Sequence, residues 1–262
     1  MEFYYFDLLF YFFIFILGLS LGSFLNSWIW RAWENIRIVA GRSMCTYCHR
    51  QLAWFENIPV FSYLCLKGRC RTCKEKISVR YILVELGMAV ILTFIYFYHN
   101  NFIEFNPIHF FRDVFFVTFL FIIFTYDAMY KIILSGVVWL GALVGFFFNY
   151  FYLSVGLADM AIGAVIGGGF FLLQFLVSRG KWIGGGDVRL GFMMGIWLGW
   201  QGVLVALMFS YVVGAVFSLM MLLLKKKTWV SEIPFGTFLA LGTFFTMYWG
   251  EQVIYFYLSL LK

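Results

Sequence analysis

The stretch LADMAIGAVIGGGFFLLQFLVSRGKWIGGGDVRL, residues 157–190, joins a long apolar run to a short polar connection. Residues 157–178 have the length that a helix needs to cross a bilayer, roughly 20 apolar residues. The connection after them carries Arg179 and Lys181 and ends in three glycines followed by Asp187. A carboxylate beside a membrane helix is costly, and it is a functional candidate by default. Its role depends on its depth in the membrane and on which other carboxylate meets it.

The whole chain has the composition of a polytopic membrane protein. Of its 262 residues, 63% are hydrophobic and 12% are charged, and the mean hydropathy is +0.89. A soluble domain carries roughly 25% charged residues. The net charge of +6 therefore reports membrane topology and does not indicate a nucleic-acid partner. We predict an all-α integral membrane protein with about eight transmembrane helices, at residues 8–30, 81–99, 110–126, 132–152, 157–178, 188–200, 203–224 and 235–259.

The basic residues orient these helices. Residues 31–80 hold ten of the nineteen Lys and Arg residues. If this loop is cytoplasmic, seventeen of the nineteen fall on the cytoplasmic side, and only Arg112 and Lys262 fall outside. The positive-inside rule thus favours a cytoplasmic loop and outer termini. We expect three parts: a first transmembrane helix at 1–30, a cytoplasmic cysteine loop at 31–80 and a polytopic membrane domain at 81–262.

The same orientation places the acidic residues. Asp127 falls at the cytoplasmic end of the third predicted span, and Asp187 at the cytoplasmic start of the sixth. Six other acids fall at or near the outer side, where solvation is sufficient to explain them: Glu2, Asp7, Glu104, Asp113, Asp159 and Glu251.

The cysteine loop contains CTYC at 45–48 and CRTC at 70–73, with 21 residues between the two pairs. This spacing approximates a structural four-thiolate zinc site. Disulfides are the alternative, but a reducing cytoplasm disfavours them. A redox-active pair is a second alternative, but the context is not that of thioredoxin. His49 and Cys65 are weaker ligand candidates. The predicted metal ligands are Cys45, Cys48, Cys70 and Cys73.

Two carboxylates that approach each other share a proton, so one can activate water while the other protonates a substrate carbonyl. Asp127 and Asp187 suit this acid–base division, and Gly184 and Gly186 would let a peptide backbone come close. A structural alternative remains. The helix dipole alone would stabilise Asp187, and Lys131 would pair with Asp127.

Four motifs in order resemble the type IV prepilin peptidases, bifunctional leader peptidases and N-methyltransferases of pilus and type II secretion systems. GSFLNSWIWR resembles the first-helix motif of this family, and GGGDVRL resembles the G-x-G-D motif of its class of intramembrane aspartyl protease. The segment CTYCHRQLAWFENIPVFSYLCLKGRCRTCKEKISVRYILVEL is similar to its cysteine domain, and IPFGTFLALG to its last helix. The motifs stand at residues 22–31, 45–86, 184–190 and 233–242.

This resemblance implies a multi-pass enzyme of the bacterial inner membrane. It implies that Asp127 and Asp187 cut prepilins and pseudopilins after a glycine at the cytoplasmic face, with zinc on the four cysteines. It further implies that S-adenosylmethionine then methylates the new N-terminal residue. A peptidase without methyltransferase activity is an alternative. Oligomeric state stays open, although the aromatic-rich helices could pack on lipid or on a second copy.

The chain also departs from the family pattern. Many members have an acid and then Leu-Pro-Asp after the first aspartate, whereas this chain reads DAMYKIILS, with Leu134 and Ser135 in place of Pro-Asp. Arg189 stands where a Lys is common.

No glycine-rich nucleotide fingerprint marks the methyl-donor site. Glu85 is a candidate for binding the substrate ammonium, and Glu56 is a second candidate on the same grounds. Glu85 has an ordinary alternative, an ion pair with Arg80 or Arg37.

Two other classes of protein deserve comparison. A cation transporter would place its acids at mid-membrane, and it would leave the cysteine loop without a role. A non-catalytic assembly scaffold would have lost a catalytic aspartate, and both aspartates are present.

Overall fold

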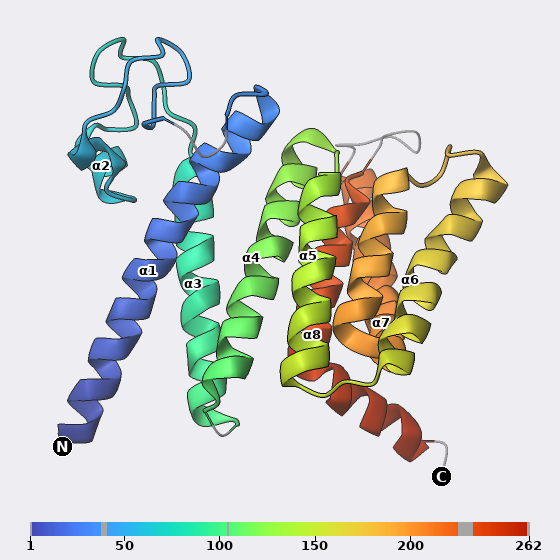
Figure 1. Ribbon diagram of the computed structural model, residues 1–262. Helices are drawn as coiled ribbons and strands as arrows, with labels where there is room; N and C mark the ends of the chain where they lie inside the picture. The colour runs from blue at the N-terminus through green and yellow to red at the C-terminus, as the bar shows by residue number, and fades with distance from the viewer. Residues whose placement is uncertain (1, 38–40, 104, 225–232, 261–262) are drawn as a thin grey trace. The chain divides into compact units, whose positions relative to one another are not determined.

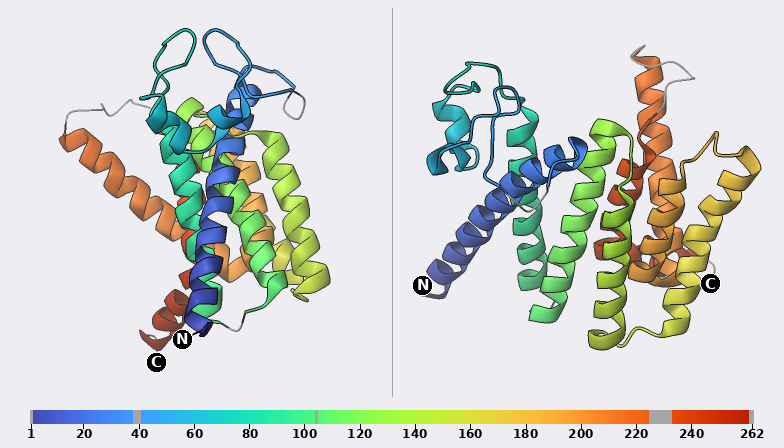
Figure 2. Two further views of the ribbon diagram at one scale, coloured as in Figure 1. Left: turned by 90° about the vertical axis from the view of Figure 1, so that its left-hand side faces the viewer. Right: turned by 45° about the horizontal axis from the view of Figure 1, so that its top comes forward.

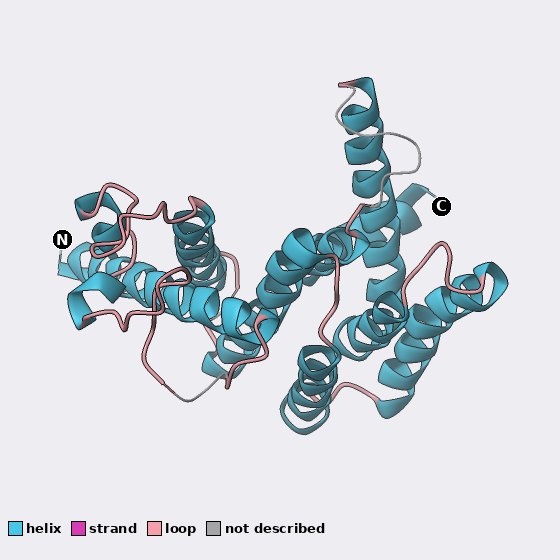
Figure 3. Ribbon diagram, turned by 90° about the horizontal axis from the view of Figure 1, so that it is seen from above, coloured by secondary structure: helices cyan, strands magenta, loops and turns pink. Residues whose placement is uncertain are grey.

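A computed structural model of the chain describes residues 2–37, 41–103, 105–224 and 233–260, with side chains from residue 7 onward. Throughout these ranges the chain forms helices joined by loops, and it contains no β-strand (Figures 1 and 3). The predicted all-α class is confirmed. The chain divides into two compact units, Met1–Val114 and Phe115–Lys262.

The first unit is built on two long helices that pack along each other, α1 and α3 (Figure 1). Glycines allow the close approach, because a Cβ added to Gly22 would lie 2.6 Å from the Cα of Glu85. Gly18, one turn earlier, meets Ala89 in the same way. Small residues four apart commonly bring membrane helices together. The helices of this unit are α1 (Glu2–Trp33), η1 (Trp54–Asn57), α2 (Phe61–Cys65), α3 (Arg80–Asn101) and the start of α4 (Pro107–Tyr130).

A buried ion cluster joins the end of α3 to the start of α4. The Nε2 atom of His99 lies 2.9 Å from Oδ2 of Asp113, and Arg112 donates to the other oxygen of Asp113 at 2.7 Å. Asp113 is only 3% exposed. The expectation that solvation explains this acid is therefore wrong, because the carboxylate ties two helices together.

The second unit contains the remaining helices, and glycines again bring two of them together. Gly163 and Gly167 of α6 face Gly195 and Gly191 of α7 so closely that no Cβ fits at any of the four positions. The backbones are therefore in direct contact, as in other small-residue membrane interfaces. The helices of this unit are the rest of α4, α5 (Ser135–Phe147), η2 (Phe148–Tyr152), α6 (Leu157–Ser178), α7 (Gly185–Leu223) and α8 (Phe235–Leu260).

The long element α7 turns back on itself at Gly199, where φ is +69° and ψ is −177°. A Cβ on Gly167 would meet both Gly191, before this point, and Val203, after it. In a straight helix those two residues would stand roughly 18 Å apart. Both halves of α7 therefore pack on the same part of α6. The second half is the orange helix that leads to the grey trace in Figure 2.

Two polar side chains satisfy the backbone at this turn. The amide nitrogen of Asn149 donates to the carbonyls of Ile196 and Trp197, at 2.8 and 3.1 Å. The carboxylate of Asp159 contacts Gly199 and accepts the N–H of Trp200 at 3.4 Å. Non-helical backbone at membrane depth needs such partners. Asp159 is only half-buried, so its carboxylate is partly solvated and also contacts this turn.

The predicted count of eight spans is not confirmed. Among the described residues, six helices are long and apolar enough to cross a membrane. The predicted spans 188–200 and 203–224 correspond to the two halves of α7 on either side of Gly199, which together count as one of the six, and α8 is not one of the six. The six are Asp7–Trp33, Arg80–Asn101, Pro107–Tyr130, Ser135–Tyr152, Leu157–Ser178 and Gly185–Leu223. Several apolar helices of this length indicate a multi-pass membrane protein.

Candidate active site and metal centre

Two similar turns present the four cysteines of the first unit. In each turn the N–H of the first cysteine donates to the carbonyl five residues on, at 2.9 Å for Cys45 and 2.8 Å for Cys70. The residue after each C-x-x-C pair has positive φ, +54° at His49 and +58° at Lys74. Each pair is thereby folded so that both thiols point the same way.

The thiols of the two turns converge. The sulfur atoms of all four cysteines lie within 4.8 Å of one another, and Cys45 and Cys73 are 3.9 Å apart. A tetrahedral zinc site with Zn–S bonds of about 2.3 Å places its sulfurs roughly 3.8 Å apart, so the cluster fits such a metal. Burial opposes ionisation of Cys70, but hydrogen bonds from the backbone N–H groups of Cys73 and Thr72 and from the thiols of Cys73 and Cys45 together lower its pKa to about 6. The same contacts with neighbouring thiols raise the pKa of Cys73. The cluster can therefore hold a metal ion through thiolates.

A cavity of about 220 Å³ lies in the first unit beside this cluster. Its walls include the aromatic rings of Trp30, Tyr63 and Tyr81. Three glutamates line it as well, and so do five basic residues: Glu56, Glu75 and Glu85, with Arg31, Arg50, Arg71, Lys76 and Arg80. Aromatic faces can bind the cationic part of a ligand, and the basic residues suit an anionic part.

Glu85 is 7% exposed and is held by neutral groups. It accepts the backbone N–H of Val60 at 2.7 Å and a bond from the Ser23 hydroxyl. Val60 has φ +60° and ψ −50°, and the N–H of Phe61 bonds back to Pro59 at 2.5 Å. This is a strained γ-turn, which is unusual for a β-branched residue. Strain of this kind often accompanies a functional site.

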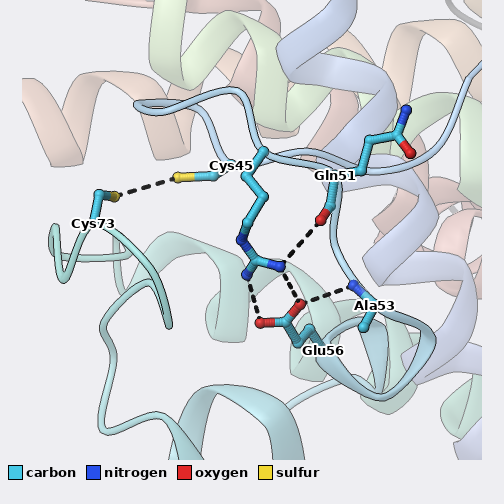
Figure 4. A network of polar contacts seen from close by, with 6 residues as sticks. Cys45, Gln51, Ala53, Glu56 and Cys73 are labelled. Atoms are coloured by element: carbon cyan, nitrogen blue, oxygen red, sulfur yellow. Dashed lines mark hydrogen bonds and ion pairs between the residues drawn. The ribbon is translucent and has the colours of Figure 1, made fainter.

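Glu56 is held by a cation (Figure 4). The guanidinium of Arg50 donates to both of its oxygens, at 3.0 and 2.7 Å, and the N–H of Ala53 donates at 2.8 Å. The bonds from Arg50 lower the pKa of Glu56 despite its burial. Of the two candidates for methyl transfer, Glu85 is thus the one with no Lys or Arg among its partners in the described chain.

Asp127 lies in the last turn of α4 and is 4% exposed. The N–H of Thr237 donates to its Oδ2 at 2.9 Å, and the N–H of Gly236 also faces the carboxylate. These two residues form the first turn of α8, where unsatisfied N–H groups and the helix dipole stabilise an anion. The start of the last helix therefore fixes the first aspartate.

Asp187 lies in the first turn of α7 and is 8% exposed. Its Oδ2 accepts the N–H of Gly184 at 3.1 Å, which caps the helix. Gly186 packs against Ile133, whose Cβ would lie 2.9 Å from an added Cβ. A Cβ at Gly184 would touch nothing closer than 3.6 Å. Gly186 is therefore required by its packing against Ile133, whereas Gly184 leaves open space beside the carboxylate.

The two aspartates open on one cavity of about 720 Å³ within the second unit. Lys131, Lys181 and Arg189 also line it, so the two carboxylates lie among three cations. Two carboxylates at one water-accessible cavity can act as base and acid in hydrolysis.

Comparison with known proteins identifies the family. Residues 114–219 match the type IV leader peptidase family, and residues 16–99 match the bacterial peptidase A24 N-terminal domain. A prepilin leader peptidase/N-methyltransferase of Pseudomonas putida is 31% identical, covering 91% of this chain and 90% of its own. One from Aeromonas salmonicida is also 31% identical, covering 94% and 93%. The chain belongs to the type IV leader peptidase family. No solved structure matches it significantly.

Two departures from the family pattern meet at one contact. Arg189 donates to the hydroxyl of Ser135, the residue that stands in place of the Asp. It also donates through Nε to the carbonyl of Gly185 at 3.0 Å. Neither departure removes an aspartate of the cavity.

Sequence reasoning did not single out Gly236, Thr237 or Val60. All three act through backbone N–H groups, which every residue except proline carries. The sequence feature that could have pointed to Gly236 and Thr237 is a glycine directly after Ile-Pro-Phe, at the start of an apolar helix. Val60 gave no signal, because nothing in its residue type indicates a positive φ.

Proposed function

We propose that this member of the leader peptidase family is a membrane-embedded aspartic endopeptidase for type IV prepilins and pseudopilins. Asp127 and Asp187 are its catalytic pair and share one proton. The observation that carries the proposal is their opening on one cavity, each held by backbone N–H groups at a helix start. The names of the relatives supply the substrate class.

The pair hydrolyses the bond after the glycine in two steps. The ionised carboxylate takes a proton from water, whose oxygen attacks the scissile carbonyl carbon while the protonated partner gives its proton to the carbonyl oxygen. The carbon–nitrogen bond then breaks, and the leaving amine takes up a proton from the pair. The leader departs with a new carboxyl group, and the mature chain with a new amino group.

The reaction takes place at the cytoplasmic face of the inner membrane. The charge distribution supports this side, because seventeen of nineteen basic residues fall there under the predicted topology. Four of the nineteen, Lys225–Lys227 and Lys262, lie outside the described residues. A prepilin whose apolar segment enters the bilayer would present its scissile bond at this depth.

The first unit methylates the new amino group. S-adenosylmethionine supplies the methyl group when bound. The aromatic rings and glutamates in the first unit's cavity suit the cations of this reaction, a sulfonium and an ammonium, while its basic residues suit the carboxylate of the methyl donor. Glu85 holds the ammonium and takes one proton from it, so that the nitrogen lone pair is free. Glu56 acts indirectly by fixing Arg50 at the wall of the cavity.

Zinc on Cys45, Cys48, Cys70 and Cys73 stabilises this unit. Four thiolates complete a tetrahedron and leave no open position, as in structural sites. Metal analysis of the purified chain should find one zinc ion per chain. The doubly substituted chain, Cys45→Ser with Cys48→Ser, should lose it. Metal-free wild-type protein that retains a cooperative unfolding transition would argue against this role.

Intact mass spectrometry tests the two activities together. The purified full chain is incubated with a prepilin-type peptide, with and without S-adenosylmethionine. We expect loss of the leader in both samples, and a gain of one methyl group only with the methyl donor. Loss of the leader alone would leave a peptidase and remove the methyltransferase. The family assignment does not favour a transporter or a scaffold.

A further inference from the structure

The cavity that holds the two aspartates contains a neutral polar pair to which no role has been given. Tyr211, on the second half of α7, donates its hydroxyl to Oε1 of Gln174 on α6, at 3.1 Å. Both side chains line the cavity, and neither is fully buried. Polar side chains in apolar membrane helices are costly and are functional candidates by default.

The pair lines the same cavity as both aspartates. The ring of Tyr211 packs edge-on against Phe235, with centroids 5.0 Å apart. Phe235 opens α8, and the two residues that follow it donate to Asp127. Asp187 lines the same cavity. A ligand that contacts Gln174 would therefore also lie close to the catalytic pair.

A peptide that enters this cavity has particular needs. It brings backbone N–H and C=O groups that lose water, and each unsatisfied group is costly at membrane depth. The charged side chains of the lining are two aspartates and three cations. An ionised aspartate only accepts hydrogen bonds, and Lys and Arg only donate them. A primary amide offers a donor and an acceptor in one plane, which matches a peptide group. Gln174 is the one amide side chain among the described lining residues.

We propose that Gln174 and Tyr211 form a subsite that binds the substrate backbone beside the scissile bond, a role that rests on the proposed peptidase function. In the free protein Gln174 accepts the Tyr211 hydroxyl through Oε1 and donates through Nε2 to the carbonyl of Phe170, at 3.4 Å. When an extended peptide enters, the amide of Gln174 bonds a peptide group of the substrate, and the Tyr211 hydroxyl stays as a second donor. The pair positions the substrate and takes no part in proton transfer.

Steady-state kinetics of leader removal test this role. Gln174→Leu and Tyr211→Phe remove the polar atoms and keep most of the side-chain volume. We expect KM for a prepilin peptide to rise roughly 5- to 15-fold in each variant, as one lost hydrogen bond predicts, with kcat within about twofold. The double variant should show less than the product of the single effects, because the two residues act as one unit.

Matched controls come from the same residue types on exposed surfaces. Gln201 and Tyr255 are exposed and do not line the cavity, and Tyr255 is 80% exposed. The control variants are therefore Gln201→Leu and Tyr255→Phe. Both should cleave with wild-type KM. The subsite is overturned if Gln174→Leu and Tyr211→Phe have the same KM as these controls. It is also overturned if both kcat and the unfolding temperature fall in these variants while KM stays constant. That result is expected if the two residues only stabilise the fold and do not contact the substrate. Absence of cleavage by the wild-type chain would instead overturn the peptidase function, and the subsite with it.

Discussion

At the scale of single residues, the position of Asp127 depends on a glycine. A Cβ at position 236 would lie 2.9 Å from Oδ2 of Asp127 and 2.8 Å from Cδ1 of Ile133. Any larger residue must therefore push the carboxylate or the start of α8 away. This contact explains why the last helix begins with a small residue at its second position.

Gly236→Ala should lower the rate of leader removal by roughly tenfold or more, since overpacking of a fitted site costs about 1–3 kcal/mol. The measurement is the initial rate of cleavage of a prepilin peptide. Gly169→Ala is the matched control, because a Cβ there meets nothing within 4 Å. Equal rates for the two variants would show that the contact with Asp127 does not matter.

A second residue-scale prediction concerns Glu56 and pH. Arg50 lowers the pKa of Glu56, so its contribution to stability is present above the unfolded-state pKa, about 4.3, and is lost as pH falls through the folded value. Glu56→Gln should therefore lower the unfolding temperature at neutral pH, and the difference from wild type should shrink below about pH 4. Thermal unfolding in detergent across this range measures it. A difference that is the same at every pH would contradict the ion pair.

The acidic residues and cysteines of both sites could be predicted from the sequence, since their chemistry resides in their side chains. Their supports could not. Asp127 is held by the N–H groups of Gly236 and Thr237, more than a hundred residues away, and no side-chain pattern encodes such a contact. The strained turn at Val60 could not be predicted either, because its contact with Glu85 is also made by a backbone N–H group.

At the scale of helices, the turn in α7 depends on a buried amide. Asn149 is 2% exposed and binds the carbonyls of Ile196 and Trp197, which a continuing helix would have satisfied itself. The lengths of the apolar runs predicted a break near residue 200. They could not predict that a π-helical turn, Phe148–Tyr152, would bring Asn149 to the broken end.

Asn149→Leu should destabilise the second unit by about 1–3 kcal/mol, the usual cost of leaving buried polar groups without partners. The measurement is denaturant or thermal unfolding of the purified chain in detergent. Asn100→Leu, at an exposed position on α3, is the control and should unfold like wild type. A wild-type unfolding curve for Asn149→Leu would mean that the turn finds other partners.

At the scale of the whole molecule, the candidate sites fall into different units. The cysteine cluster, Glu56 and Glu85 belong to the first, and Asp127 and Asp187 to the second. Motif order predicted the family, and the two family matches, residues 16–99 and 114–219, fall almost wholly one in each unit. The predicted count of spans is not confirmed, because the two halves of α7 count as one of the six candidate helices and α8 is not among them.

Separate sites predict separable activities. Glu85→Gln should abolish methylation of a peptide that already has its new N-terminus, and it should leave leader removal within about twofold of wild type. Mass spectrometry of both reactions in one preparation measures this. Methylation at the wild-type rate would exclude Glu85 from the reaction.

The most direct test of the central claim is leader removal by Asp127→Asn and Asp187→Asn, each purified as the full chain. Asn keeps the size of the side chain and cannot exchange the proton. We predict that intact mass spectrometry will find no cleaved prepilin peptide with either variant, while metal content and methylation of a pre-cut peptide match wild type. Cleavage by both variants at a rate near that of wild type would contradict the assignment of the two aspartates as the catalytic pair.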